Sequence, residues 1–393
     1  MTSPLRPALV SALAVAFAVA AGCKKDGPGD AAADGGNGGC GAGSYACAAG
    51  CCDCPGAGVA TAIALLAAGA GADLSAGGDF DGDGRLDLVL AVNAAGGGGV
   101  ASFLAVGCGG FVPGATALAG ATLTGLDAAA LDGAGAPADV VAFAGDRTLY
   151  ALDGDGLATR WSDTLSALGS AGLALAAHLD ATDTDDDVIA FDATLGSLLR
   201  VENTGAGWNV RTMVLLPPGI VKVSVGDVGG GPRDEIFFAG PGGLVEVVSV
   251  ADFDFSDVRV LNAGAHGAAA VGDLDGDGDG DLAVVADGML ERWNGDGNTG
   301  VTYVEATGLP GSFAGIDVVA LEYDGAPPAE AAVLQSGGSV VVLSAAGGTL
   351  VSTAQADTAA SARRVFAGDV DGDARDDLVV VDATGTAWVW RTP

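Results

Sequence analysis

Hydrophobic and polar residues alternate with a period of two in seven short runs spread over most of the chain. A continuously apolar run precedes each alternating run, and turn residues such as Gly, Asp and Asn separate them. Alternation bounded by turn residues predicts half-buried strands, and short apolar runs are typical of strands buried on both faces. No stretch shows a 3.6-residue amphipathic stripe, so the chain is predicted to be all-β. The alternating runs are 99–106, 147–154, 196–203, 243–250, 288–295, 338–345 and 385–392.

An acidic loop stands before each apolar run, and the seven loops recur at a nearly constant spacing. They begin near residues 79, 130, 178, 227, 273, 322 and 369, so successive offsets are 46 to 51 residues. The clearest copies are 77–93, 271–288 and 367–385. A further run, such as 300–306, follows in most copies and gives each unit four strands. Four-stranded units at this period predict a seven-bladed β-propeller, whereas an open β-solenoid normally uses shorter repeats.

The two ends of the repeat array complement each other. The seventh copy stops at Pro393, directly after its third strand, and so lacks a fourth. Residues 59–66 (VATAIALL) lie before the first loop and belong to no copy of their own. We therefore predict that this N-terminal strand completes the last blade and closes the ring. A helical spacer is the alternative, because the segment is rich in alanine.

Three of the loops carry aspartate at positions one, three, five and nine, with Gly84 or Gly278 at position six in two of them and Ala374 in the third. Four carboxylates within nine residues repel one another unless a cation neutralises them, and Ca²⁺ takes six to eight oxygen ligands. A backbone carbonyl at position seven supplies one more oxygen. Solvated turns held by Asx hydrogen bonds are the alternative. The predicted ligands are Asp79, Asp81, Asp83, Arg85 and Asp87 in the first loop, Asp273, Asp275, Asp277, Asp279 and Asp281 in the fifth, and Asp369, Asp371, Asp373, Arg375 and Asp377 in the seventh.

These acidic segments resemble the FG-GAP or VCBS repeats of propellers such as the heads of integrin α-chains, over roughly residues 73–393. The resemblance implies a structural calcium ion in each of the three full loops, about three in all, held by the twelve aspartates. An EF-hand is excluded because its position-twelve Glu is replaced by Leu90, Val284 and Val380, and because strands flank the loops.

The other four loops depart from this pattern. Loops two, four and six are predicted to be empty, and calcium in loop three is left open. Their acids are Asp132 and Asp139 in the second, Asp180, Asp183 and Asp187 in the third, Asp227 and Glu235 in the fourth, and Glu322, Asp324 and Glu330 in the sixth. Gly229, Gly231 and Ala326 stand where ligands would be needed.

The N-terminus has the features of an export signal, predicted over 1–22: Arg6 is followed by the apolar stretch 8–20 and by Ala-Gly-Cys23. The segment ending in Cys23 resembles a bacterial lipobox, although Ala20 stands where Leu is usual. The resemblance implies lipidation of Cys23 and a protein of the bacterial cell envelope, facing the periplasm or the exterior and touching the membrane only through its anchor. Plain secretion and an uncleaved anchor are the alternatives.

Residues 23–56 are dominated by Gly, Ala and Asp and are predicted to form a flexible tether before the propeller of 57–393. Six cysteines remain once Cys23 is lipidated, and an even count outside the cytoplasm favours disulfides. A thiolate metal cluster is the alternative, because Cys51 and Cys54 are two residues apart. No pairing can be assigned among Cys40, Cys47, Cys51, Cys52, Cys54 and Cys108.

The net charge and the scarcity of residue types used in catalysis limit the classes of function open to this protein. The 50 acidic and 16 basic residues give a formal charge of −34, which repels nucleic acids. The two histidines, His178 and His266, share no motif with a nucleophile, and three tryptophans on third strands (Trp293, Trp388, Trp390) are expected in the core. We therefore predict a monomeric, non-catalytic binding or scaffold module for a protein or polysaccharide. A lectin and a lyase-like enzyme acting on polysaccharides are the alternatives.

Overall fold

A computed structural model of the chain describes its residues from 44 to 392 with gaps. The described ranges are 44–47, 50–53, 60–66, 72, 74–92, 98–107, 109–170, 172–180, 184–192, 194–216, 222–229, 233–250, 254–262, 264–297, 300–310, 314–324, 327–345 and 350–392. The predicted signal segment and the lipidation site at Cys23 lie outside these ranges. So do Cys40, Cys54 and Cys108, and the disulfide prediction stays a prediction.

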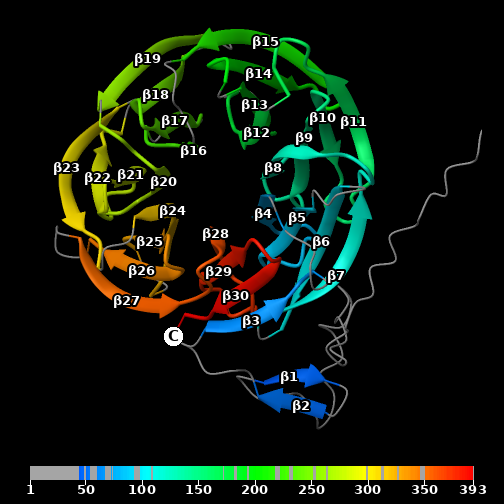
Figure 1. Ribbon diagram of the computed structural model, residues 1–393, viewed down its shortest axis with the longest axis vertical. Helices are drawn as coiled ribbons and strands as arrows, with labels where there is room; N and C mark the ends of the chain where they lie inside the picture. Colours follow the sequence, from blue (N-terminus) through cyan, green and yellow to red (C-terminus); the bar gives the residue numbers. More distant parts are fainter. Residues whose placement is uncertain are drawn as a thin grey trace, which may run out of the picture.

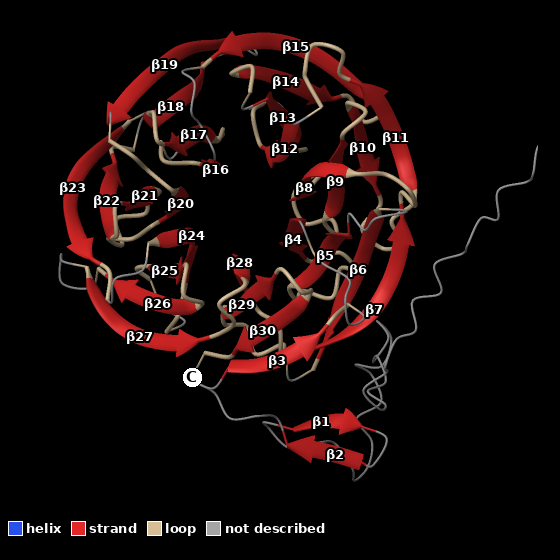
Figure 2. Cartoon of the chain, in the orientation of Figure 1, coloured by secondary structure: helices blue, strands red, loops and turns tan. Residues whose placement is uncertain are grey.

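Seven four-stranded antiparallel sheets form a closed ring around a central opening (Figure 1). The described part of the chain consists of strands and loops (Figure 2), and it includes no helix with the length and apolar character of a membrane span. The prediction of an all-β, seven-bladed propeller is confirmed. Six blades take their four strands in chain order, from the innermost at the opening to the outermost at the rim, and the seventh does so for its first three strands.

The blades are built as follows. Blade one is β4 (Leu74–Gly78), β5 (Asp87–Val92), β6 (Gly99–Val106) and β7 (Gly110–Ala117); blade two is β8 (Leu123–Ala129), β9 (Asp139–Ala144), β10 (Thr148–Leu152) and β11 (Thr159–Thr164); blade three is β12 (Gly172–Ala177), β13 (Asp187–Asp192), β14 (Ser197–Asn203) and β15 (Trp208–Leu215). Blade four is β16 (Lys222–Gly226), β17 (Glu235–Gly240), β18 (Gly243–Val250) and β19 (Asp254–Asn262); blade five is β20 (Ala268–Gly272), β21 (Asp281–Ala286), β22 (Met289–Gly295) and β23 (Val301–Gly308). Blade six is β24 (Gly315–Leu321), β25 (Glu330–Gln335), β26 (Ser339–Ser344) and β27 (Val351–Asp357).

The seventh blade joins the two ends of the chain. Its first three strands are β28 (Ala362–Gly368), β29 (Asp377–Asp382) and β30 (Thr386–Trp390), and its outermost strand is β3 (Ala60–Ala64). β3 runs antiparallel to β30, with Ala60 opposite Trp390 and Ala64 opposite Thr386. The predicted closure by an N-terminal strand is therefore confirmed, and the helical alternative is wrong. Pairing leaves β30 without an open edge.

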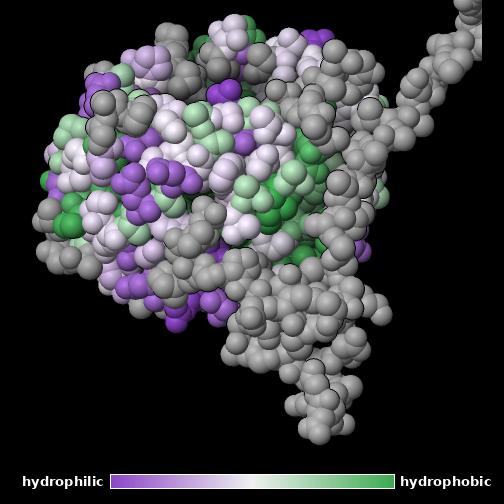
Figure 3. Space-filling model, turned by 60° about the horizontal axis from the view of Figure 1, so that its bottom comes forward, coloured by the Kyte–Doolittle hydropathy of each residue, from purple (hydrophilic) through white to green (hydrophobic). Residues whose placement is uncertain are grey.

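Seven hydrophobic clusters lie between neighbouring blades, one at each junction of the ring. At the junction of blades seven and one, Leu88 and Phe103 pack with Val379 and Val389. The second strand is buried on both faces in every blade, which explains its continuous apolar run. Outer strands such as β11 and β27 are largely exposed. In Figure 3 hydrophilic residues stand among near-neutral ones, with a hydrophobic region beside the atoms drawn in grey.

Two further features bear on the predictions. Trp293 and Trp390 are buried, and Trp388 packs half-buried against the cluster between blades six and seven, as expected of core residues.

Within the predicted tether, β1 (Ser44–Cys47) and β2 (Gly50–Asp53) pair as a two-residue-loop hairpin, with Tyr45 opposite Cys52. The glycine-rich composition hides this hairpin, because it lacks an alternating pattern.

Candidate metal sites

Each acidic loop links the innermost strand of a blade to its second strand. In the three full loops the last residue of the inner strand is a glycine paired directly with the position-nine aspartate, as in Gly78 with Asp87. The loop therefore connects two directly paired strands, and the residue at position one lies close to the residue at position nine. This local geometry sets the direction in which the carboxylates point.

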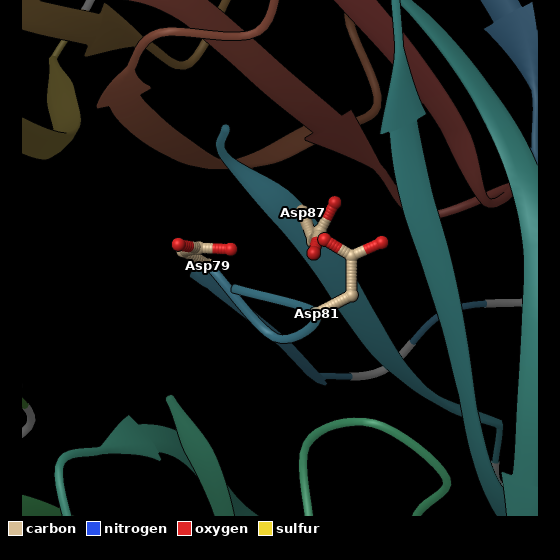
Figure 4. A group of neighbouring side chains, drawn as sticks. All are labelled: Asp79, Asp81 and Asp87. Atoms are coloured by element: carbon tan, nitrogen blue, oxygen red, sulfur yellow. The ribbon is translucent and has the colours of Figure 1, made fainter. Parts of the chain in front are cut away.

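The carboxylates at positions one, three and nine converge in each full loop. One oxygen from each of the three lies within 4.8 Å of the others in three groups: Asp79, Asp81 and Asp87; Asp273, Asp275 and Asp281; and Asp369, Asp371 and Asp377. Figure 4 shows the first group, with the carboxylates of Asp81 and Asp87 side by side and that of Asp79 across from them. Three anionic oxygens at this spacing fit a hard divalent cation such as Ca²⁺, whose remaining ligands come from carbonyls and water.

The position-nine aspartate is buried and fixed by two backbone amides. Asp87 Oδ2 accepts a hydrogen bond from the N–H of Phe80 (3.0 Å), and Oδ1 accepts one from the N–H of Ala105 on the third strand (2.6 Å). Asp281 and Asp377 make the matching pairs of bonds. Phe80, at position two, is fully buried between blades one and two. The loop is therefore anchored by one apolar residue and one buried acid.

The position-one aspartate holds the turn itself. Asp79 Oδ1 accepts hydrogen bonds from the N–H groups of Gly82 (2.8 Å) and Asp83 (3.0 Å), and Oδ2 accepts one from Gly84 (2.9 Å). Loop seven repeats all three bonds around Asp369, whereas loop five repeats two around Asp273 and its Asp277 N–H donates to Asp275 Oδ1. Such bonds are those expected of a solvated turn without metal, the alternative given above. They are compatible with the convergence of the three carboxylates.

The aspartates at position five lie outside the three convergent groups. Asp83 Oδ1 accepts the N–H of Arg85 (3.1 Å), and its Oδ2 lies 3.3 Å from the Arg85 guanidinium. Asp277 and Asp373 likewise accept the N–H of the residue at position seven. None of the three belongs to a convergent group among the described residues. Their ligand roles, and those of the position-seven carbonyls of Arg85, Asp279 and Arg375, stay predictions.

The convergent groups concentrate negative charge, and only in loop seven does an arginine pair with one of their described carboxylates. Burial, together with the neighbouring aspartates at positions three and five, raises the pKa of Asp87 to about 7, of Asp281 to about 6 and of Asp377 to about 7. In loop seven, Asp371 Oδ2 lies 3.1 Å from an Arg391 guanidinium nitrogen, while its Oδ1 is buried and has no hydrogen-bond partner among the described residues. A cation bound among these oxygens would lower all three pKa values.

In loop two an arginine bridges two carboxylates at the place where each full loop gathers three. Arg160, on the fourth strand β11, places Nη1 2.5 Å from Asp139 Oδ2 and Nη2 2.5 Å from Asp132 Oδ1. Asp132 occupies position three, and Asp139 begins the second strand as Asp87 does in loop one. The guanidinium therefore bridges the same two carboxylates that would share an ion. In loop two, which is predicted to bind no metal, the Arg160 side chain therefore supplies the positive charge, and we call such an arginine a built-in cation.

Loop three uses the same device from another strand. Asp187 begins the second strand β13 and accepts a hydrogen bond from the Arg200 guanidinium, which lies on β14 and is 1% exposed. Asp187 also accepts the N–H of Asn203 (2.9 Å). The position-nine carboxylate of loop three is thus neutralised by the chain itself, which argues against calcium there. Sequence reasoning missed Arg160 and Arg200, although a lone arginine within a buried run such as SLLRVEN is a usable signal.

Loops four and six replace the position-nine aspartate with glutamate. Glu235 accepts the N–H of Val228 (3.0 Å), and Glu330 accepts the N–H of Tyr323 (2.9 Å). The longer side chain keeps the structural hydrogen bond to position two. No convergent acidic group forms in these loops among the described residues, and their lack of metal stays a prediction.

Position six of the full loops has positive φ, which provides a test of the turn. Gly84 and Gly278 have φ of 83° and 94°, whereas Ala374 has φ of 66°. A left-handed conformation costs an L-residue about 1 kcal/mol relative to glycine. We expect Ala374→Gly to stabilise the protein by about that amount and Gly84→Ala, which meets no steric clash, to destabilise it similarly. Urea unfolding of both variants measures this, and shifts of equal sign would contradict it.

Comparison with known proteins supports the fold. Neither a protein-family model nor a curated protein matches the sequence. Among solved structures, BBS1N in complex with ARL6DN is similar in two crystals, one soaked with mercury (TM-score 0.60) and one soaked with lead (TM-score 0.61). In each case 12% of residues are identical, and the match covers 85% of this chain and 96% of BBS1N. At this identity the likeness concerns architecture, and it places the chain among seven-bladed β-propellers.

Proposed function

We propose that the chain is a calcium-stabilised, envelope-anchored propeller that serves as a non-catalytic binding or scaffold module for a protein or polysaccharide. The observation that carries the calcium assignment is the convergence of three carboxylates at one position in blades one, five and seven. Blades two and three support it, because the same place is served there by the guanidinium groups of Arg160 and Arg200. In blade seven Arg391 lies beside Asp371 and relieves part of the charge, so the need for an ion is greatest in blades one and five.

The binding role rests on the rigid ring and on a solved relative. BBS1N, similar in fold, was crystallised in complex with ARL6DN. Seven packed blade junctions hold the loops of this chain in fixed positions, which favours a surface used for recognition. The two histidines lie in different blades, and the Nε2 of His266 is 3.4 Å from Glu291 rather than beside a nucleophile. A non-catalytic role is the simpler interpretation of this arrangement.

Calorimetric titration of metal-free protein with Ca²⁺ tests the ion assignment. We expect three ions per chain, and Asp81→Asn, Asp275→Asn and Asp371→Asn each to remove one of them. Asp324→Asn, at position three of loop six, is the matched control and should leave three. If the number of calcium ions bound per chain were the same in the first three variants as in the natural chain, the assignment would be refuted.

The partner is tested separately on a glycan array probed with and without calcium. Calcium-dependent sugar binding would favour a lectin, and release of products from a polysaccharide would favour the enzymatic alternative. Failure to bind any glycan would favour a protein partner. These outcomes are independent of the number of ions.

The stabilising effect of calcium should depend on pH. The pKa values of Asp87, Asp281 and Asp377 in the folded protein (about 6 to 7) exceed the ordinary value near 3.9 expected when unfolded. Without metal, the folded state therefore binds more protons between about pH 4 and 7, and its stability falls as pH rises through this window. Calcium competes with these protons, so its effect on the unfolding temperature should be largest at pH 8 and smallest at pH 5. A calcium-induced rise in unfolding temperature that is the same from pH 5 to 8 would contradict this prediction.

A further inference from the structure

The seven innermost strands stand around the axis of the ring (Figure 1), and a cavity of about 210 Å³, here called the central channel, lies among six of them. Residues of β4, β8, β16, β20, β24 and β28 line the cavity. Most of the lining residues are small or apolar, although polar atoms provide most of the exposed wall. The exceptions are four ionisable residues, Asp127, Lys222, Asp317 and Arg364, contributed by four different blades.

The repeat register explains why these residues meet. Lys222, Asp317 and Arg364 each lie four residues before the last residue of their inner strand, and Asp127 lies two before the end of β8. Side chains two residues apart on a strand point to the same face, so all four occupy equivalent faces of their inner strands, and all four line the cavity. The acidic loops begin after the strand ends, roughly 13 Å further along the axis. The ionisable belt is therefore a separate site.

One carboxylate in this belt faces two cations. Asp317 Oδ2 lies 3.2 Å from Arg364 Nε and accepts the N–H of Val365 (3.0 Å), while Asp317 Oδ1 lies 3.7 Å from Lys222 Nζ. The ammonium contact is longer than a hydrogen bond. Among the described residues, neither Nη of Arg364 donates a hydrogen bond that would use its forked face. Both cations keep donors for a further anionic group, since Lys222 has three and Arg364 five.

The charge of the belt contrasts with that of the whole chain. Lys222 is the only lysine after residue 25 in a protein with a formal charge of −34. Its side chain retains 32% of its exposed surface and that of Arg364 retains 44%, so both are accessible from the cavity. Burial lowers the pKa of Lys222, opposed by Asp317, and raises the pKa of Asp127 to about 6, opposed by the N–H of Ala176. The two carboxylates of the belt balance its two cations, so an anion there would be held by the unused donors of Lys222 and Arg364 rather than by a net positive field.

We propose that the central channel binds a small organic anion whose carboxylate or phosphate group is held between Lys222 and Arg364. A cavity of about 150 Å³ holds a benzene molecule, so 210 Å³ suits a compact ligand no larger than a single sugar acid. Ser224 and Asp127 supply oxygens at the wall for the hydroxyl groups of such a ligand. The guanidinium plane matches the two oxygens of a carboxylate or phosphate.

The competing interpretation is an ion network that only joins blades four, six and seven. The two differ in what Asp317→Asn does. For an anion site, the substitution removes the internal competitor, keeps an acceptor for the Val365 N–H and tightens binding severalfold. For a joining network, it weakens the fold and creates no affinity for anions.

The experiment is calorimetric titration of the calcium-loaded chain at low salt with galacturonate and with inorganic phosphate, and with galactose as the uncharged control. We expect saturable binding of at least one anion, weakened at least tenfold by Lys222→Met or Arg364→Gln. Arg363→Gln removes the same charge from the neighbouring exposed position outside the cavity and should change little. Tighter binding of galacturonate would identify a carboxylate ligand, and tighter binding of phosphate would identify a phosphate ligand.

Four results would overturn the proposal. They are the absence of binding by both anions at millimolar concentration, equal binding of galactose, equal weakening by Arg363→Gln and Arg364→Gln, and destabilisation by Asp317→Asn without tighter binding. The third result would show general charge attraction rather than a site. Thermal unfolding of each variant separates loss of binding from loss of fold.

Discussion

Removal of divalent cations is expected to lower the midpoint of thermal unfolding by roughly 6 °C at neutral pH. Extracellular calcium modules often bind with Kd of about 0.1 to 1 mM, so a site with Kd near 0.5 mM gains about 1.4 kcal/mol at 5 mM calcium. Three sites give about 4 kcal/mol, and a domain of about 340 residues shifts by about 1.4 °C per kcal/mol. The loops carry this effect because each is anchored in a blade junction, as Phe80 is between blades one and two.

The measurement is a pair of thermal scans, one with 5 mM calcium and one after exhaustive chelation and dialysis. A variant with Asp81→Asn, Asp275→Asn and Asp371→Asn together is the control, and its two scans should coincide. Magnesium at the same concentration should act more weakly, because it demands a stricter octahedral geometry. Coincident scans for the natural chain would remove calcium from the proposed function while leaving the fold and the channel site unaffected.

Replacing Arg200 with methionine is expected to destabilise the protein by about 3 to 5 kcal/mol. The guanidinium is 1% exposed and hydrogen-bonds the buried Asp187, so the substitution leaves a buried carboxylate without its charge partner. The cost should shrink as pH falls towards 5, where the carboxyl can take up a proton. Adding Asp187→Asn to Arg200→Met should recover most of the loss, because asparagine still accepts the N–H of Asn203.

Urea unfolding at pH 7.5 and pH 5 measures this effect. Arg211→Met is the matched control: its guanidinium pairs with Glu202 in the same blade but is 45% exposed, so little change is expected. Equal stability of the Arg200 and Arg211 variants would show that the buried pair does not act as a built-in cation. It would also weaken the argument that the loop in blade three takes the place of an ion site.

The position-five aspartates illustrate what loop spacing leaves undecided. Spacing treats Asp79, Asp81, Asp83 and Asp87 as equivalent acids within one short turn. The folded loop brings three of them together, whereas Asp83 accepts the N–H of Arg85 two residues on. Which acids converge depends on backbone dihedral angles inside the turn, such as φ of 83° at Gly84, and these are not encoded by spacing.

The sequence by itself determined the number of blades, the four-stranded unit, the ring closure by residues 59–66 and the loops able to gather carboxylates. All of these follow from short-range patterns: strand alternation, turn residues and a repeat of 46 to 51 residues. Only the tertiary structure decided that Arg160 and Arg200 serve two loops as cations and that Lys222, Asp317 and Arg364 share one belt. Those contacts join different strands or blades, so they arise only when the ring brings residues distant in sequence together.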